Sequence, residues 1–539
     1  MSDITLRMAL GTLAKSSSFS VATETKHTDD PLNKYKKYLY VEPDIEHDFV
    51  NCLDSIQQNE IVFLCGSSGD GKSEILTRYI DKYKHKCRFH LDATHSFAPS
   101  ETAIDALNNL FDKQNIDGKP LVIGINIGML ANFSKEGAER HEELRESLER
   151  FLATGNRTDG CYHFLDFEAY PKFVFKDGFC HAPFIRKVLQ QLSNLSDKNP
   201  YYKLLLQTEH TGCESILASN FRLLARASVQ QAIITSLFKV RLSKNQFITT
   251  RALLDFLHDL LTRDKYLFDG LFTSERSELS HKLTEFDPAL IHTQKLDQFA
   301  LQYELGLIGD HLDIFLNALS NETGIKIQLQ PDAKGQAASL IRLLYVLQGE
   351  SLANDYHRQF TADFNENALS HYAHIWALHS QSEDEIQDKT ALRNFYTREF
   401  IPAIVSYANR NAPRLGKREL FLGEFGTTLV SSPIELKQDL TAVQNCSNES
   451  VSHFMAFIKL GEKTLRGIEV NLNLFGLIHK INNGYCPNKY DKNAVLLLDD
   501  ICDQLADIAR DSSQLKIYDR HDEYLLRQED DLIYVEVDF

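Results

Sequence analysis

The sequence lacks the features that mark membrane and secreted proteins. None of its apolar runs approaches the roughly 18 residues of a transmembrane helix. Its nine cysteines are scattered, odd in number and without a C-x-x-C pair, which is typical of reduced structural thiols. The N-terminus, MSDITLRMALGTLAKSSS, has no sustained apolar core and no cleavage site, so we expect no signal peptide. These absences predict a cytoplasmic protein that does not associate with membranes.

Basic residues are also fewer than acidic residues. The chain has 58 Lys and Arg against 75 Asp and Glu, a formal net charge of −17. Affinity for the phosphate backbone of DNA comes largely from clustered Lys and Arg, so this balance argues against a protein that coats DNA by itself. The apolar content of 43% is ordinary for a globular protein, and 539 residues suffice for roughly two to four domains.

The most informative stretch is EIVFLCGSSGDGKSEILTRYIDKYK, residues 60–84. Its apolar run, residues 61–65, has the length of a buried parallel strand. A glycine-rich turn follows, and then apolar residues recur at the spacing of a helix, at Ile75, Leu76, Tyr79 and Ile80. The turn fits G-x-x-x-x-G-K-[ST] at every position and lies between a strand and a helix, which is the context that a phosphate-binding loop (P-loop) requires.

This pattern follows from the chemistry of binding a polyphosphate. Backbone N–H groups must approach the phosphates closely, and Gly66, Gly69 and Gly71 carry no side chains that would block them. The helix N-terminus adds partial positive charge, Lys72 would reach the β- and γ-phosphates, and the Ser73 hydroxyl would bind Mg²⁺. We therefore predict that ATP (or GTP) binds with Mg²⁺, in contact with Gly66, Ser67, Ser68, Gly69, Asp70, Gly71, Lys72, Ser73 and Glu74.

The flanking pattern predicts a parallel α/β sheet around this loop. Further apolar strands are expected at 87–94, 119–130 and 161–168, separated by helices at 101–113 and 136–152. A helix at 45–58 leads into the first strand. The loop would then lie at the carboxyl edge of the sheet, where open α/β sheets bind their ligands.

The whole chain divides into five expected segments. They are an N-terminal arm and linker (1–44), an ATPase core (45–182), a helical lid (183–265), a helical domain (266–400) and a mixed α+β region (401–539). The arm begins with a short amphipathic stretch, Leu6, Met8, Leu10 and Leu13. In the last segment, AVLLLDD (494–500) is predicted to start a helix, and residues 524–527 and 532–537 to form a terminal hairpin.

Three acids at strand ends are candidates to hold the Mg²⁺ shell or to orient water. They are Asp92, Asp166 and Glu168. GINIGML resembles the sensor strand of AAA+-type ATPases, in which an asparagine, here Asn126, contacts the γ-phosphate or the attacking water. On that resemblance Asp92 is the Mg²⁺-linked acid, and Asp166 or Glu168 is the alternative.

A second resemblance to AAA+ proteins lies in TTRALLDFLHDLL, residues 249–261. It is similar to the lid helix that carries a second sensor, with Thr249 or Thr250 as its N-terminal cap. Arg251 would be that sensor and would stabilise charge on the transferred phosphoryl group. The expected fold is therefore an α/β P-loop NTPase with an AAA+-like core, a helical lid, a largely helical middle region and a mixed α+β C-terminal region.

The longer blocks resemble one family. MALGTLAKSSSFSV, YLYVE, FLCGSSGDGKSEILTRY, HLDATHSF, IGINIGML, FLDFEAYPKF and TTRALLDFLHDLL are together similar to the DptF (DndF) family of DNA phosphorothioation-dependent restriction proteins. The resemblance covers roughly residues 1–265. It implies an ATP-driven subunit of a bacterial antiphage complex that acts on unmodified DNA with companion DptG and DptH subunits. Because the chain shows no nuclease pattern, DNA cleavage would belong to a partner or to the assembly.

Two other functions fit the same motifs. Between Lys72 and Asn126 there is no apolar strand ending in Asp-Glu, so ATP could fix an assembly scaffold with little hydrolysis. A STAND-like sensor ATPase in another pathway would also carry this P-loop. Turnover, its dependence on DNA and the identity of the partner distinguish the three hypotheses.

Overall fold

A computed structural model describes residues 4–14, 31–91, 102–176, 179–212, 214–244, 246–274, 276–328, 335–364, 367–380, 386–446, 451–519, 522–529 and 532–538. The contacts divide the chain into two units. The first unit comprises residues 1–172, 182–237 and 247–364, and the second comprises 173–181, 238–246 and 365–539. The first unit holds most of the predicted core, lid and helical domain, whereas residues 173–181 and 238–246 belong to the second unit.

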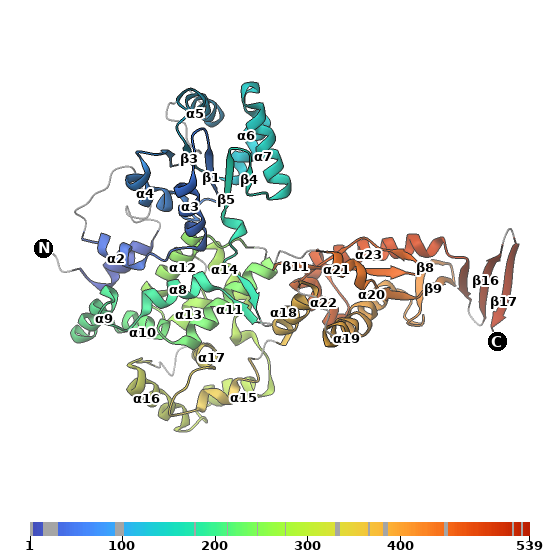
Figure 1. Ribbon diagram of the computed structural model, residues 1–539. Coiled ribbons are helices and arrows are strands. Elements are labelled where there is room, and N and C mark those ends of the chain that lie inside the picture. The colour runs from blue at the N-terminus through green and yellow to red at the C-terminus, as the bar shows by residue number, and fades with distance from the viewer. Residues whose placement is uncertain are drawn as a thin grey trace. The chain divides into compact units, whose positions relative to one another are not determined.

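A five-stranded sheet forms the centre of the α/β part of the first unit (Figure 1). Its strand order is β2-β3-β1-β5-β4, in which β2, β3, β1 and β5 are parallel and β4 is antiparallel. The strands are β1 (Ile61–Cys65), β2 (Arg88–His90), β3 (Leu121–Ile125), β4 (Thr158–Asp159) and β5 (Tyr162–Asp166). The predicted parallel α/β sheet is thus confirmed.

Helices cover both faces of this sheet because successive residues of a strand point to opposite sides. On β1, Phe63 packs with α5, α6 and α7, whereas Val62 and Leu64 pack with α3 and α4 on the other face (Figure 1). All three of these side chains are buried. The helices are α3 (Asp44–Ser55), α4 (Lys72–Tyr83), α5 (Ala103–Asp117), α6 (Ile127–Glu136) and α7 (Glu142–Thr154).

The rest of the first unit is helical in its described residues, as predicted. Its helices include α8 (Pro183–Ser193), α9 (Pro200–Thr211), α10 (Ser215–Leu224), α11 (Ala227–Lys244), α12 (Thr250–Thr262), α13 (Leu267–Phe272), α14 (Glu278–Leu283), α15 (Gln294–Glu304), α16 (His311–Thr323) and α17 (Gln336–Leu347). α11 runs on past residue 237 into a segment of the second unit. α12 buries a continuous apolar stripe, namely Leu253, Phe256, Leu257, Leu260 and Leu261.

The N-terminal segment packs within the first unit. α1 (Leu6–Leu10) and the short helix η1 (Gly11–Leu13) lie against α9 and α12. Leu6, Leu10 and Leu13 are fully buried, but Met8 is 48% exposed, so one position of the predicted apolar stripe faces outward. α2 (Asn33–Leu39) follows; the predicted polar linker at 16–30 lies outside the described residues.

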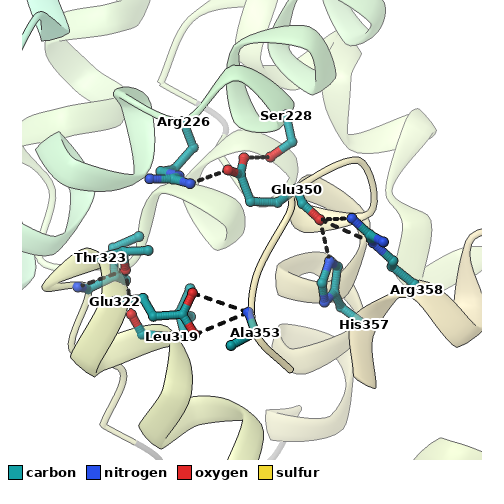
Figure 2. Close-up of polar contacts among 10 residues, drawn as sticks. Arg226, Ser228, Leu319, Glu322, Thr323, Glu350, Ala353, His357 and Arg358 are labelled. Carbon is teal, nitrogen blue, oxygen red and sulfur yellow. Dashed lines mark hydrogen bonds and ion pairs between the residues drawn. The ribbon is translucent and has the colours of Figure 1, made fainter. Parts of the chain in front are cut away.

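Two carboxylates hold the segment after α17 in place, as Figure 2 shows. The side chain of Glu350 accepts hydrogen bonds from Arg226 and from Ser228, the latter over 2.9 Å. Burial alone would raise the pKa of Glu350, but these hydrogen bonds outweigh it and lower the pKa. Glu322 on α16 accepts the N–H of Ala353 at 3.1 and 3.2 Å. These contacts tie the segment to α11 and to α16.

The second unit is a mixed α+β structure, as predicted for the C-terminal region. Phe175 packs against Phe238, Tyr372 and Trp376 with ring centroids 5.0, 5.9 and 5.1 Å away. An antiparallel sheet has the order β17-β16-β15-β9-β8. The elements include β6 (Val174–Lys176), β7 (Phe179–His181), α18 (Asn367–Ser380), α19 (Ile386–Phe395), α20 (Ile401–Ala408), β8 (Glu419–Phe425), β9 (Thr428–Pro433), β10 (Leu436–Gln438), α21 (Leu440–Asn445), β11 (His453–Ala456), β12 (Ile458–Leu460), β13 (Lys463–Thr464), β14 (Ile468–Asn471), α22 (Leu472–Asn482), α23 (Lys492–Arg510), β15 (Gln514–Tyr518), β16 (Glu523–Glu529) and β17 (Leu532–Asp538).

Several local predictions can be compared directly with these elements. The helix through 494–500 and the terminal hairpin are confirmed by α23 and by the β16–β17 pairing. The strand predicted at 119–130 was too long, because β3 ends at Ile125 and α6 begins at Ile127. The single helix predicted at 136–152 is wrong at its start, since α6 ends at Glu136 and α7 begins at Glu142. In the part of the chain described, no helix has the length and apolarity needed to span a bilayer.

Gly124 on β3 allows close packing beside the loop edge of the sheet. A Cβ at this position would lie 2.7 Å from the backbone oxygen of Leu91 and 2.8 Å from Leu76 Cδ1. We expect Gly124→Ala to lower the free energy of unfolding by about 1–3 kcal/mol in urea denaturation. In the matched Gly128→Ala variant, in α6, the new Cβ would meet Asn126 Oδ1 at an ordinary 3.5 Å. Better helix propensity should then keep the change neutral or stabilising by up to about 1 kcal/mol; equal losses in both variants would contradict the account.

Candidate functional site

The glycine-rich turn lies between the buried strand β1 and the start of α4 at Lys72. Gly69 and Gly71 have φ angles of 90° and 108°, in the left-handed region that favours glycine. Gly71 is the N-cap of α4, and a Cβ placed on it would meet no atom within 4 Å. The loop therefore leaves open space at the helix N-terminus, where unpaired N–H groups and the helix dipole attract anions.

Lys72 folds back over its own loop. Its Nζ donates hydrogen bonds to the backbone oxygens of Gly66 and Ser67, each over 2.8 Å. Ser73 follows in the first turn of α4, and its backbone oxygen accepts the hydroxyl of Thr77 at 2.7 Å. The predicted phosphate-binding lysine and the predicted Mg²⁺-binding hydroxyl thus lie at the mouth of the same loop.

Asp70 is a charged residue buried inside the loop, with no exposed side-chain surface. Its Oδ2 accepts the N–H of Ser67 over 2.8 Å, and its Oδ1 accepts Lys172 Nζ over 2.7 Å. Lys172 comes shortly after β5, and its Nζ also lies 5.5 Å from the centre of the Phe247 ring. The buried carboxylate is thus paired with a cation from a distant part of the sequence.

The first turn of α12 is hydrogen-bonded to the backbone of the loop. The N–H of Arg251 donates to the backbone oxygen of Gly69 over 2.9 Å, and the hydroxyl of Thr250 donates to that of Asp70 over 3.2 Å. Thr249 caps the helix by accepting the N–H of Ala252 at 3.1 Å, which confirms the first of the two predicted caps. An otherwise unpaired N–H of the α12 terminus is in this way satisfied by the backbone of the glycine-rich loop.

The side chain of Arg251 points back toward the N-terminal segment. Its Nη1 donates to the backbone oxygen of Leu13 over 3.1 Å and lies 3.9 Å from Asp255 Oδ1. Burial lowers the pKa of Arg251, against the opposing charges of Asp255 and Glu74. The guanidinium is thus bound to the N-terminal segment, and Arg251 also lines the cleft beside the loop.

These groups surround one cleft with a volume of ≈ 660 Å³, within the range of small-molecule sites. Its lining includes Ser68, Gly69, Asp70, Gly71, Lys72, Ser73 and Glu74 from the loop, Asn126, Lys172, Thr250 and Arg251, and residues Leu39–Ile45 before the first strand. The cleft thus brings together most of the predicted nucleotide-binding residues.

Asn126 lies one residue beyond the end of β3. Its sequence context predicted a place in the strand. In the structure, Asn126 is instead the N-cap of α6. Its Oδ1 accepts the N–H of Met129 over 2.6 Å, and the residue lines the cleft. The side-chain oxygen of Asn126 thus acts as the helix cap, and the residue itself still lines the cleft.

The three candidate acids are placed differently. Asp92 lies outside the described residues; Leu91, directly before it, lines the cleft. Asp166 ends β5 opposite Cys65, and burial raises the pKa of its carboxyl. Lys72 is close enough to Asp166 to oppose that shift. Glu168 is exposed, and neither Glu168 nor Asp166 lines the cleft; of the two, Asp166 interacts with Lys72.

Glu74 also lines the cleft, but it faces Lys36 of α2 over 2.9 Å. The sequence analysis assigned no role to Lys36 or Lys172. Lys172 stands in EAYPKF and Lys36 in NKYKKYL, where no spacing distinguishes a lysine that turns inward from one that is solvated. Thr250 was considered only as a cap. Their places in the site depend on contacts between distant segments.

The chain was compared with protein-family models, with curated proteins and with solved structures, and none of them matches it. The family resemblance of the sequence blocks therefore stays a prediction.

The close approach of the loop and α12 can be tested at two glycines. A Cβ on Gly69 would lie 2.8 Å from Arg251 Cβ, in addition to the strain of its positive φ. Gly71 has the same kind of φ but open space around it. We expect Gly69→Ala to lower the free energy of unfolding by about 2–4 kcal/mol and Gly71→Ala by about 1–2 kcal/mol, measured by urea denaturation. A larger loss in Gly71→Ala would contradict the contact between loop and α12.

Proposed function

We propose that this chain is an ATP-binding and ATP-hydrolysing subunit of a bacterial restriction complex that depends on DNA phosphorothioation. One observation carries the nucleotide-binding part of the proposal. The G-x-x-x-x-G-K-S loop joins a buried parallel strand to a helix N-terminus, and Lys72, Ser73 and Arg251 line one cleft around it. Convergent cations and helix-terminal N–H groups are what a triphosphate requires.

The residues present fit a magnesium nucleotide. The positive φ angles of Gly69 and Gly71 and the open space at Gly71 make room for phosphate oxygens beside the backbone. Lys72 would bind the β- and γ-phosphates, and Ser73 would hold Mg²⁺, which neutralises charge that develops during phosphoryl transfer. Asp92 is the proposed second Mg²⁺-linked residue. Asp166 is the alternative, because it ends the strand next to β1 and lies near Lys72.

The AAA+-like assignment draws on the order of the strands. β3, which leads to Asn126, lies between β1 and β2, and β2 leads toward Asp92. The carboxyl ends of these parallel strands meet at one edge of the sheet. Arg251, on the first turn of α12, supplies a cation from the lid, and its backbone is bonded to the loop. This arrangement supports Asn126 and Arg251 as the two proposed sensors of the γ-phosphate.

The assignment to a restriction complex draws on the resemblance to the DptF family. A net charge of −17 favours contact with DNA through companion subunits of the DptG and DptH type, rather than through this chain alone. The work of the subunit would be to couple ATP binding and turnover to action on unmodified DNA. Cleavage itself is assigned to the assembly.

A second function, a nucleotide-dependent assembly scaffold with little hydrolysis, is favoured by one observation. The side-chain oxygen of Asn126 accepts the N–H of Met129, which occupies one of its two lone pairs and fixes its orientation as a helix cap. An attacking water is best oriented by a group that can accept its proton or hydrogen bond. Binding without turnover would therefore favour the scaffold.

Steady-state ATP hydrolysis tests the role of the loop. We expect Lys72→Ala to reduce turnover by at least about 100-fold, because it removes a cation that stabilises the transferring phosphoryl group. Lys84→Ala, at an exposed lysine just after α4, is the matched control and should retain wild-type turnover. Asp92→Asn and Asp166→Asn, run in parallel, identify the Mg²⁺-linked acid as the one whose loss abolishes turnover. Wild-type turnover unchanged by Lys72→Ala would refute the ATPase proposal.

The restriction role predicts a dependence on partners. Adding DptG- and DptH-type subunits with unmodified double-stranded DNA should raise turnover several-fold, whereas phosphorothioated DNA of the same sequence should raise it less. ATP hydrolysis by the reconstituted mixture is the measurement, with each component left out in turn. Tight ATP binding with negligible turnover in every mixture would favour the scaffold, and no association with these subunits would favour the sensor of another pathway.

A further inference from the structure

We propose that Lys172 is a positioning residue for nucleotide binding, because it neutralises the buried Asp70 carboxylate inside the phosphate-binding loop. The inference rests on the proposed function and deepens it. It assigns a role to a residue that no sequence pattern identifies and that lies 102 positions away from its partner.

The geometry leaves the pair little contact with water. The Asp70 side chain has 0% exposed surface and that of Lys172 has 15%. One carboxylate oxygen is bonded to Lys172 Nζ over 2.7 Å and the other to the N–H of Ser67 over 2.8 Å. The ring of Phe247 lies on the lysine, 5.5 Å from Nζ. Charges shielded in this way interact more strongly than charges at the surface.

The position of Asp70 makes its charge matter for binding. It lies between Gly69 and Gly71, whose backbone forms the proposed phosphate cradle. A negative charge fixed there would repel a polyphosphate that carries several negative charges of its own. Lys172 cancels this charge, and Asp70 can then brace the loop through Ser67 without opposing the ligand.

The same pair also fixes the shape of the loop. The carboxylate bonds Ser67, while the backbone oxygens of Gly69 and Asp70 are bonded by the first turn of α12. The loop is therefore held by two segments: Lys172, which follows β5, and the first turn of α12. Lys172 is also the last residue of its segment in the first unit.

The test is equilibrium binding of a non-hydrolysable ATP analogue, adenylyl imidodiphosphate, with Mg²⁺ by isothermal titration calorimetry. Lys172→Met should raise the Kd at least about tenfold, because a buried charge loses its partner. Lys172→Arg should stay within about threefold of wild type, since the cation is kept. Lys84→Met is the matched control: this lysine follows α4, is 68% exposed and does not line the cleft, so the Kd should stay within about threefold of wild type.

The decisive variant removes both charges. Asp70→Asn keeps an oxygen for Ser67 but carries no charge, so Asp70→Asn/Lys172→Met should bind within about threefold of Asp70→Asn alone. A purely structural role for Lys172 would instead leave the double variant as weak as Lys172→Met. This comparison also decides the question if Lys172→Met alone fails to fold, because the double variant contains no unpaired buried charge.

The outcomes separate the inference from the function on which it rests. A wild-type chain that binds no nucleotide contradicts the proposed function. Wild-type binding with Lys172→Met unchanged, or with the double variant weaker than Asp70→Asn by tenfold or more, overturns the inference alone.

Discussion

The hydrogen bond from the N–H of Arg251 to the backbone oxygen of Gly69 is the contact on which the candidate site depends. It joins the glycine-rich loop, at the edge of the sheet, to the N-terminus of α12. The first N–H groups of a helix have no acceptor within the helix, and this hydrogen bond supplies one. Gly69 is what allows the approach, because a Cβ there would lie 2.8 Å from Arg251 Cβ. This hydrogen bond and the close approach at Gly69 thus hold the loop against the first turn of α12.

Charge within this structure is balanced locally. The chain is acidic overall, yet the cleft gathers Lys72, Lys172 and Arg251 at one place. Asp70, the acid buried within the loop, is paired with Lys172, and Glu74 is paired with Lys36. Lys72 and Arg251 are the remaining cations beside the loop, and Glu42 and Asp44 also line the cleft. A chain that is acidic overall can in this way gather cations around one loop.

The sequence was sufficient to predict what depends on local pattern. The apolar run predicts the strand β1, the glycine spacing predicts the turn, and the helical spacing after Lys72 predicts α4. All three are present. Strand ends were harder to predict. β3 ends at Ile125 because Asn126 caps α6. The apolar content of the segment does not reveal where such a cap ends the strand. Lys172 and Thr250 could not have been predicted, since their roles come from segments more than 100 residues from the loop. The place of Asp92 stays a prediction.

The most direct test of the account is amide hydrogen exchange of the full chain with and without adenylyl imidodiphosphate and Mg²⁺. If the cleft binds a triphosphate, slower exchange should appear in two separate segments, the loop at 66–74 and the start of α12 at 249–254. Protection of both would show that nucleotide binds where strand, loop and lid helix meet. Unchanged exchange in the loop at saturating nucleotide, or protection confined to another part of the chain, would contradict the central claim.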